Sequence, residues 1–331
     1  MRWRWWLERG AVWLMKFMPG RPAGGCGVSD GMYESSGGVA GSGGPAGGGG
    51  RAGGGGGGSA PWRADLQRLV EKLNAAQSMQ YWGGMRTRRF AYAAFAAHVL
   101  DVQGKRARRV IEFRSQFGED VTAWEMLGPQ TRGFYIEAGA FDGEHFSVSY
   151  AFDAMGWDGL LVEPLPEKAA ACRRARPEAR VVHAALGRAG SAGTTTLRTT
   201  ADPLDGMFSY TGAHRPMLGQ GVDNASAVEV PMTSLNALLD SHPGGAPARV
   251  DLAVIDVEGT ELDVLDGFDL KRWRPRVLIV EDNTRGQDNE LTAYMKGMPY
   301  QLVGLLEVNR LYTLTDEPEL ATRSRYFGDV I

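Results

Sequence analysis

The chain has 331 residues, which allows one large or two small domains, and 46 of these residues are glycine. Its 36 lysines and arginines against 39 acidic residues give a formal net charge of −3, so there is no electrostatic reason to expect a nucleic acid partner. Cys26 and Cys172 are the only cysteines, which argues against a disulfide framework and favours a reducing compartment such as the cytoplasm.

Residues 1–62 form a glycine-rich segment. From Pro19 to Pro61 the chain is mostly Gly, Ala and Ser, which bury too little apolar surface to offset the entropy of ordering. We therefore predict a disordered extension. Its first eighteen residues mix arginine and tryptophan, as a membrane-surface helix does. Glu8 and Arg9 interrupt the apolar run. We therefore interpret the first eighteen residues as an upstream extension without a structural role. No run of the chain is long and apolar enough to span a bilayer, and we expect no membrane partner.

Residues 63–130 are predicted to be a helical cap on the domain that follows. Apolar residues recur at helical spacing from Leu66 to Leu73. A second helical segment, Arg89–Phe113, is rich in alanine and ends in basic residues. We expect both segments to flank or cover a ligand site.

Strands and helices alternate from Gly133 onward, which predicts an α/β fold for residues 131–331, with a mostly parallel sheet and helices on both faces. The predicted strands are Phe134–Ala138, Gly159–Glu163, Arg180–Ala184, Leu252–Asp256 and Val277–Glu281. Helices are predicted at Ser147–Met155, Pro166–Arg174, Ser234–Leu239 and Glu261–Leu265. A terminal hairpin is predicted from Tyr300–Leu305 and Arg310–Leu314.

The first two predicted strands end in features that favour a nucleoside cofactor. Gly139 and Gly143 allow a tight turn and a close approach of the backbone to a ligand, although an ordinary turn between strand and helix has such glycines too. Glu163 ends the second strand, where an acidic residue can bind ribose hydroxyls. The predicted cofactor residues, of which the last two would line an adenine, are Glu137, Gly139, Ala140, Asp142, Gly143, Glu163, Ala184 and Ala185.

The same residues indicate which cofactor is bound. Glu137 stands where a dinucleotide fingerprint has its first glycine, and its charge would repel a diphosphate. S-adenosylmethionine (SAM) has a ribose, an adenine, an ammonium and a sulfonium, and no phosphate. We therefore predict SAM as the cofactor.

Residues 187–231 form a long insertion that is rich in Thr, Gly and Asp. Thr194–Thr199 and Met207–Thr211 are predicted to be short strands within it. Long loops in compact domains are usually functional or disordered, so we predict a substrate-recognition lid.

Asp256 ends the fourth predicted strand, at the same edge of the sheet as the cofactor residues. Methyl transfer depends on positioning, and an alcohol acceptor must also lose its proton. Asp256 is therefore the predicted catalytic residue, as general base or as the group that orients the acceptor. Of Glu258 and Glu261, we expect one to contact the pocket and the other to serve the first helical turn. His145 and His214 are alternative bases.

Several of these motifs together resemble the FkbM family of SAM-dependent methyltransferases, over roughly Phe113 to Leu314. The matching segments are Ser115–Asp120, Phe134–Gly143, Trp157–Pro164, Val250–Glu261, Val264–Gly267 and Leu278–Glu281. The resemblance implies a class I, Rossmann-like methyltransferase fold with a terminal antiparallel hairpin. It also implies metal-independent O-methylation, and it would place Gln116 and Glu119 near the pocket.

A metal is the alternative at this edge of the sheet. Asp256 at one strand end and Asp282-Asn283 at the next resemble the metal site of catechol-type O-methyltransferases. Their oxygen atoms would suit Mg²⁺, whereas Asp282-Asn283 could equally begin a turn.

The predicted function is O-methylation of a hydroxyl on a small metabolite, glycan or polyketide. The alternative is a non-catalytic FkbM-like module that binds another protein. The acidic strand ends favour the enzyme, because a binding module has no physical need to keep them. Glu137 and the missing glycine argue against a third possibility, an NAD-dependent oxidoreductase.

Overall fold

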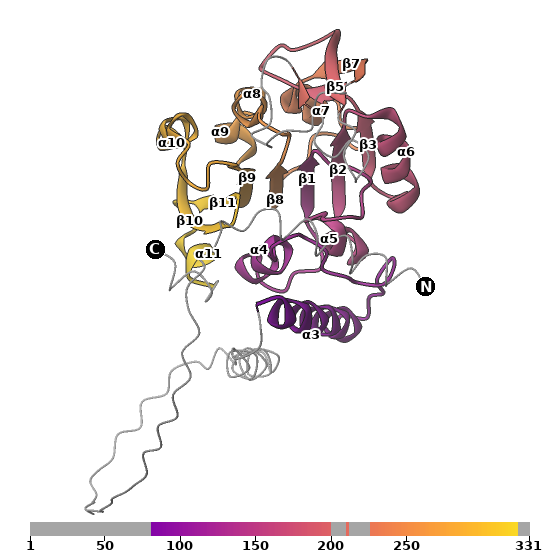
Figure 1. Cartoon of the computed structure of the whole chain (residues 1–331). Helices are drawn as coiled ribbons and strands as arrows, with labels where there is room; N and C mark the ends of the chain where they lie inside the picture. Colours follow the sequence, from indigo (N-terminus) through magenta and orange to yellow (C-terminus); the bar gives the residue numbers. More distant parts are fainter. Residues whose placement is uncertain (1–80, 200–209, 212–225, 324–331) are drawn as a thin grey trace, which may run out of the picture. The chain divides into compact units, whose positions relative to one another are not determined.

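The computed structural model describes residues 81–199, 210–211 and 226–323, all within the compact unit Ser59–Ile331 (Figure 1). At its centre is a seven-stranded sheet with the strand order β10-β11-β9-β8-β1-β2-β3. Its strands are β1 (Phe134–Ala138), β2 (Asp158–Glu163), β3 (Arg180–His183), β8 (Leu252–Ile255), β9 (Val277–Glu281), β10 (Tyr300–Leu306) and β11 (Asn309–Leu314). All neighbours from β3 to β9 are parallel, whereas β11 is antiparallel to both β9 and β10. The predicted fold class and its terminal hairpin are confirmed.

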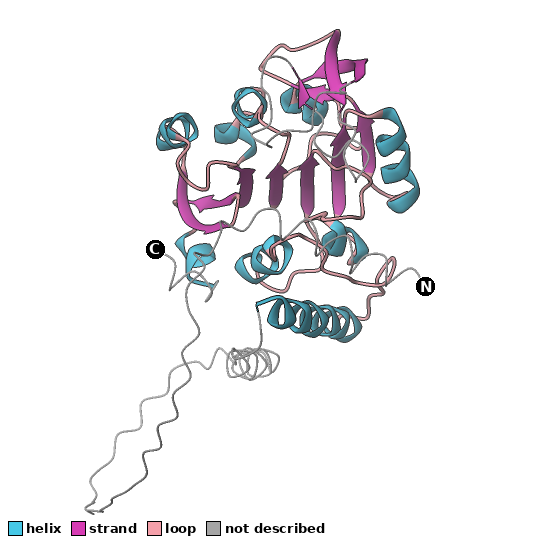
Figure 2. Ribbon diagram, viewed as in Figure 1, coloured by secondary structure: helices cyan, strands magenta, loops and turns pink. Residues whose placement is uncertain are grey.

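Helices cover both faces of this sheet (Figure 2). One core contains residues of α3 (Tyr81–Val102), α4 (Glu119–Leu127), α5 (Tyr150–Ala154) and α6 (Pro166–Ala175). The other contains residues of α7 (Leu235–Asp240), α8 (Glu261–Asp266), α9 (Leu270–Trp273) and α10 (Asn289–Lys296). A last helix, α11 (Pro318–Arg323), follows β11. Among the described helices, none has the length and apolar character needed to cross a membrane.

Alternate strand residues enter the two cores, because successive side chains of a strand point to opposite faces. In β1, Phe134 and Ile136 pack with the second core, and Tyr135 packs with the first. Burial on both faces explains why these strands are nearly continuous apolar runs.

The helix predicted over Arg89–Phe113 is wrong in its second half, because α3 ends at Val102. Gly104 adopts φ +65°, and the amide of Lys105 donates to the carbonyl of Leu100 at 2.9 Å. A glycine of this conformation just beyond a helix caps its last carbonyls and ends it. The basic residues beyond it therefore lie on an irregular segment, where Arg108 and Arg109 pair with Asp153.

The helix predicted over Ser147–Met155 is also shorter than expected, since α5 begins at Tyr150. Phe146 has φ +58°, which is incompatible with a helix. Ser147 and Ser149 use their hydroxyls to bind the carboxylate of Glu137. A tertiary contact thus decides where this helix starts.

The insertion contributes to a second sheet with the order β4-β7-β5-β6. Its strands are β4 (Ala185–Leu186), β5 (Thr194–Thr199), β6 (Tyr210–Thr211) and β7 (Ser226–Thr233). The strand predicted at Thr194–Thr199 is confirmed. Figure 1 shows β5 and β7 on the side toward which the arrowheads of β1 and β2 point. Of the predicted strand Met207–Thr211, only its last two residues belong to the described part of the chain.

Three other expectations concern regions that the structure does not test. The extension over residues 1–62 and the helical pattern from Leu66 to Leu73 lie outside the described residues. The division between a cap at 63–130 and a domain at 131–331 stays a prediction. Residues from both sides of that boundary share the first core.

Candidate functional site

The carboxyl ends of β1, β2 and β8 meet at one edge of the sheet. Ala138 of β1 lies opposite Val162 of β2 and Ile255 of β8. The residues that follow these strands are therefore brought together from three distant parts of the sequence. In open parallel sheets, this edge is where ligands bind.

Gly139 lies at the centre of this edge. Its amide donates to the carbonyl of Val162 at 3.0 Å, and the amide of Asp256 donates to the carbonyl of Ala138 at 3.1 Å. Gly139 has φ +82°, and a Cβ at this position would overlap the carbonyl oxygen of Asp256. Only glycine therefore fits between the end of β1 and the chain that follows β8. The next residue, Ala140, is buried and also donates its amide to Val162.

Glu163 is buried beside this turn, with 5% of its surface exposed. Its carboxylate accepts hydrogen bonds from the amides of Phe141 at 2.8 Å and Leu165 at 2.9 Å. Burial raises the pKa of Glu163 to about 8, against the lowering effect of these two bonds. Glu163, the residue predicted to bind the ribose, thus fixes the glycine turn to the end of β2.

The predicted adenine residues adjoin Glu163. Ala184 and Ala185 are each 3% exposed, and the amide of Ala184 donates to the carbonyl of Glu163 at 3.2 Å. They continue the chain from β3 into β4 of the smaller sheet. Their position at the same strand end is compatible with the predicted role.

Glu137 is enclosed by protein donors. Its carboxylate accepts hydrogen bonds from the amide of Val148 at 2.8 Å and from the hydroxyls of Ser147 at 2.7 Å and Ser149 at 2.5 Å. The guanidinium of Arg176, which is fully buried, lies 3.5 Å away. Both carboxylate oxygens are thus bound within the protein, and the cofactor contact predicted for Glu137 stays a prediction.

Asp142 and Gly143 shape the far end of the turn. Asp142 accepts from the amides of Glu144 and His145 at 2.9 Å each, and lies 2.5 Å from Nδ1 of His145. Burial opposes ionisation of Asp142, but the hydrogen bonds from His145 and Glu144 outweigh it and lower the pKa. Gly143 has φ +80°, and a Cβ there would lie 3.1 Å from Cα of Cys172 in α6. The Sγ of Cys172 donates to the carbonyl of Phe141 at 3.0 Å.

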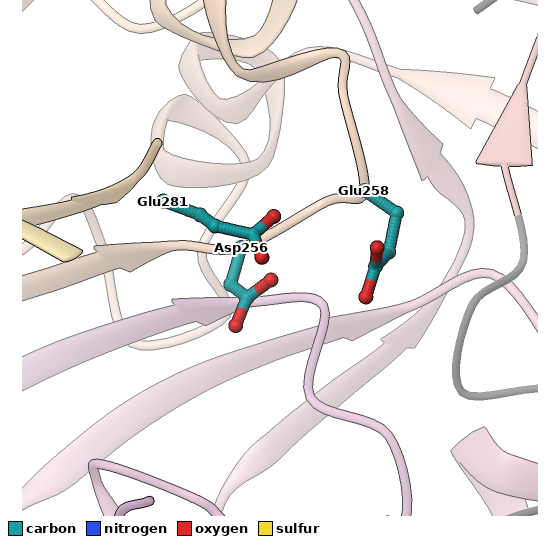
Figure 3. A group of neighbouring side chains, drawn as sticks. All are labelled: Asp256, Glu258 and Glu281. Carbon is teal, nitrogen blue, oxygen red and sulfur yellow. The ribbon is translucent and has the colours of Figure 1, made fainter. Parts of the chain in front are cut away.

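Asp256 belongs to a group of three carboxylates at the ends of β8 and β9 (Figure 3). One carboxylate oxygen from each of Asp256, Glu258 and Glu281 lies within 4.8 Å of the others. Burial and the neighbouring Glu261 raise the pKa of Asp256 to about 7. Burial and Asp256 raise the pKa of Glu281 well above its usual range.

The two glutamates after β8 have different roles. Glu261 accepts hydrogen bonds from the amides of Gly259 at 2.9 Å and Val257 at 3.3 Å, at the start of α8. Glu258 has φ +57° and points toward Asp256 (Figure 3). Glu258 therefore belongs to the group with Asp256 and Glu281, and Glu261 serves the helical turn. The predicted contact of one of them with a pocket stays a prediction.

The metal ligands considered from the sequence are not assembled as a set. Asp282 accepts from Nε of Arg310 at 2.6 Å and from the amides of Gly286 at 2.7 Å and Thr284 at 2.9 Å. Asn283 is exposed. Glu281 and Glu258 join Asp256 instead. The sequence signal for Glu281 was its place as the last residue of a predicted strand.

Glu119 lies near this group from α4. It is buried, accepts from Nδ2 of Asn309 at 2.7 Å and from the amide of Phe117 at 2.8 Å, and its charge helps to raise the pKa of Asp256. The first residue of α4 thus contributes to the acidic surroundings of Asp256. The place near the pocket that the resemblance implied for Gln116 and Glu119 stays a prediction.

Comparison with known proteins gives a family match over this region. Residues 137–302 match the sequence profile of the family described as Methyltransferase FkbM domain. No curated protein matches the chain. The C-terminal domain of precorrin-6Y C5,15-methyltransferase from Rhodobacter capsulatus, a solved structure, is similar with 12% identity and a TM-score of 0.31. The similarity covers 59% of this chain and 85% of that one.

Proposed function

The chain belongs to the FkbM family of methyltransferases, and from this premise we propose that it is a SAM-dependent O-methyltransferase. Its acceptor would be a hydroxyl of a small metabolite, glycan or polyketide. The observation that carries the proposal is the pair of carboxylates, Glu163 and Asp256, at the ends of the two strands that flank β1, on either side of the Gly139 turn.

The residues at this edge fit a cofactor that is cationic and has no phosphate. The side chains of Glu163 and Glu281, with Asp256 between their strands, offer acceptor oxygens and, when ionised, negative charge, which suit a cationic ligand better than a phosphate. We assign Glu163 to the ribose hydroxyls, the turn from Gly139 to Gly143 to the amino acid end, and Ala184 with Ala185 to the adenine. When bound, SAM supplies a methyl group on a positively charged sulfur that departs as a neutral thioether.

Asp256 is suited to take the acceptor proton. The O–H bond of the acceptor breaks, its proton passes to the Asp256 carboxylate, and the oxygen forms the new bond to carbon. A base works best when its pKa lies near the working pH, and burial with Glu261 raises the pKa of Asp256 to about 7.

Isothermal titration of the full chain with SAM tests the cofactor. We expect SAM binding and no NAD binding. Glu163→Ala should weaken SAM binding about ten-fold, because its hydrogen bond to the ribose is lost. Glu167→Ala removes an exposed acid four residues along and should leave the affinity unchanged. Equal affinity of Glu163→Ala and the unaltered protein would show that the pocket is elsewhere.

Transfer of labelled methyl groups to a panel of hydroxylated acceptors tests the reaction. Asp256→Asn should reduce turnover at least about a hundred-fold while SAM still binds. Asp266→Asn, at an exposed position of α8, is the matched control. Full turnover by Asp256→Asn would remove Asp256 from its proposed role.

The alternative function, a non-catalytic module that binds another protein, predicts a different outcome. It would show no methyl transfer to any acceptor and would bind SAM weakly or not at all. The lid assigned to residues 187–231 and the cytoplasmic location stay proposals. The lid is supported by the position of β5 and β7 beyond the arrowheads of β1 and β2 (Figure 1).

A further inference from the structure

We infer that Asp256, Glu258 and Glu281 bind one hard divalent cation, such as Mg²⁺, Mn²⁺ or Ca²⁺. The cation would hold an acceptor through two adjacent oxygen atoms, as in a vicinal diol or a hydroxy ketone. The assignment of the acceptor rests on the proposed function, whereas binding of the cation does not.

The first argument is geometric. The three carboxylates come from the end of β8, the turn after it and the end of β9, and one oxygen of each lies within 4.8 Å of the others. Ca²⁺ lies about 2.3–2.6 Å from its oxygen ligands, so oxygens on opposite sides of the ion are about 5 Å apart. Mg²⁺ lies about 2.0–2.1 Å from its ligands, which would need a contraction of a few tenths of an ångström.

The second argument is a buried polar atom without a partner. Glu281 is 9% exposed, and within the described residues its buried Oε2 has no hydrogen-bond donor. The side chain shares hydrogen bonds with two other acids, Asp256 and Glu261, which need a proton between them. Figure 3 shows its carboxylate directed toward Asp256. A buried polar atom without a partner is costly, and a cation would satisfy it.

The third argument is charge. Three other buried carboxylates pair with arginine: Asp153 with Arg109, Asp251 with Arg249 and Asp282 with Arg310. The charged neighbours that act most strongly on Glu281 are acidic: Asp256, Glu258 and Glu261. Like charges at this distance repel strongly in a protein interior. A divalent cation would offset the repulsion.

The consequence for the reaction concerns how the acceptor is held. Mg²⁺ usually keeps several ligand positions for water or substrate oxygen, so two neighbouring oxygens of one acceptor can occupy them. Asp256 would then contribute one carboxylate oxygen to the cation and leave the other for the acceptor proton. An acceptor with a single isolated hydroxyl would be held less firmly.

Binding of Mn²⁺ to the full chain tests the inference, after treatment with a chelator and dialysis. We expect electron paramagnetic resonance to show one tightly bound Mn²⁺ per chain, displaced by Mg²⁺ or Ca²⁺. Glu281→Gln and Glu258→Gln keep the side-chain size and remove one charge each, and each should weaken Mn²⁺ binding at least about ten-fold. Glu290→Gln, at an exposed position of α10, is the control and should bind as the unaltered chain does.

Two results would overturn the inference. One is no stoichiometric binding of Mn²⁺, Mg²⁺ or Ca²⁺, which would mean that a proton shared by Asp256 and Glu281 relieves their repulsion. The other is tight binding that neither glutamine variant weakens. Circular dichroism checks that the variants fold, and Glu258→Gln keeps the test decisive if Glu281→Gln does not fold, since Glu258 is only partly buried.

Parallel titration with SAM separates this inference from the proposed function. SAM binding without cation binding would leave the methyltransferase standing and remove the cation site. Cation binding without SAM binding would leave the cation site standing and remove the proposed methyltransferase function. With both present, methyl transfer should fall on chelation and return when Mg²⁺ or Mn²⁺ is added back, most clearly for vicinal diols.

Discussion

Gly139 connects the turn after β1 to the chain after β8 by direct contact of main-chain atoms. Two properties restrict the position to glycine: the positive φ, and the lack of room for a Cβ beside the carbonyl oxygen of Asp256. Gly245 has a similar φ of +85°, but a Cβ added there would have no atom within 4 Å, so its cost on substitution is backbone strain alone. The two glycines therefore allow strain and steric overlap to be measured separately.

We predict that Gly245→Ala will lower the free energy of unfolding by about 1–2 kcal/mol, the cost of a left-handed alanine. Gly139→Ala should lower it by clearly more, about 3 kcal/mol or above, because strand separation adds to the strain. Urea unfolding of both variants measures the difference. Equal losses would show that β1 and β8 separate at little cost.

Glu163 should make stability depend on pH. Its pKa is raised from 4.5 to about 8 by burial, so between these values the folded protein holds a proton that the unfolded chain has released. Stability should therefore decrease as the pH rises from about 4.5 to about 8, by up to about 1.4 kcal/mol per pH unit, and level off above.

Glu163→Gln cannot titrate, so its stability should lack this component of the slope. Urea unfolding across this range, with Glu167→Gln as the exposed control, makes the comparison. Parallel curves for Glu163→Gln and the unaltered chain would contradict the raised pKa.

At the scale of elements, the start of α5 depends on a buried ion pair. Arg176 follows α6 and donates to the carbonyl of Gly143 at 2.8 Å and to Oγ of Ser149 at 2.6 Å, with Glu137 at 3.5 Å. It thereby links α6, the glycine turn and the segment that leads into α5. Removing one member of a buried pair leaves the other charge without compensation.

We predict that Arg176→Met will lower the free energy of unfolding by about 3–5 kcal/mol. The double variant Glu137→Gln/Arg176→Met should lose less than the sum of the two single variants, because the remaining charge is gone. Arg188→Met, which breaks the exposed pair with Asp263, should change stability little. Additive losses in the double-mutant cycle would show that the pair is not coupled.

The elements show what could be read from the sequence and what could not. The strands Phe134–Ala138 and Val277–Glu281 were predicted with their correct ends, because burial on both faces makes a continuous apolar run. The ends of α3 and α5 were missed because a capping glycine at position 104 and serine bonds to Glu137 set them. Neither the capping glycine nor the serine bonds can be recognised from the spacing of apolar residues in the sequence.

The same distinction holds for the site. Glu163 and Asp256 could be placed together because parallel strands bring their carboxyl ends to one edge. The group with Glu258 and Glu281 was not foreseen. Glu258 turns inward only through a left-handed backbone conformation, which the sequence does not indicate. Glu281 was predicted only as the last residue of a strand. Asp282, which was considered instead, is bound by Arg310.

At the scale of the whole described unit, α3 and α4 share a core with the sheet. Trp124 of α4 is 1% exposed and packs edge-on against Tyr92 and Phe95, with ring centroids 6.0 Å and 5.7 Å apart. The same core contains Tyr135 of β1. A cap that shares its core with the sheet should unfold together with it.

We predict that Trp124→Ala will lower the free energy of unfolding by about 3–5 kcal/mol, from lost apolar burial and the cavity left behind. Unfolding should remain one transition, with far-ultraviolet circular dichroism and tryptophan fluorescence changing at the same urea concentration. Two separate transitions would show that the cap and the sheet are independent units.

The contact between Cys172 and the glycine turn gives the protein a built-in reporter of loop opening. The thiol is fully buried, donates to the carbonyl of Phe141, and has a pKa raised to about 12, chiefly by burial. A thiol reagent can modify it only during moments when the turn separates from α6. In a Cys26→Ser background, the modification rate would therefore count those openings. A cofactor that rests on the turn should slow the rate in proportion to its occupancy, which gives a binding assay that requires neither a label nor an identified acceptor.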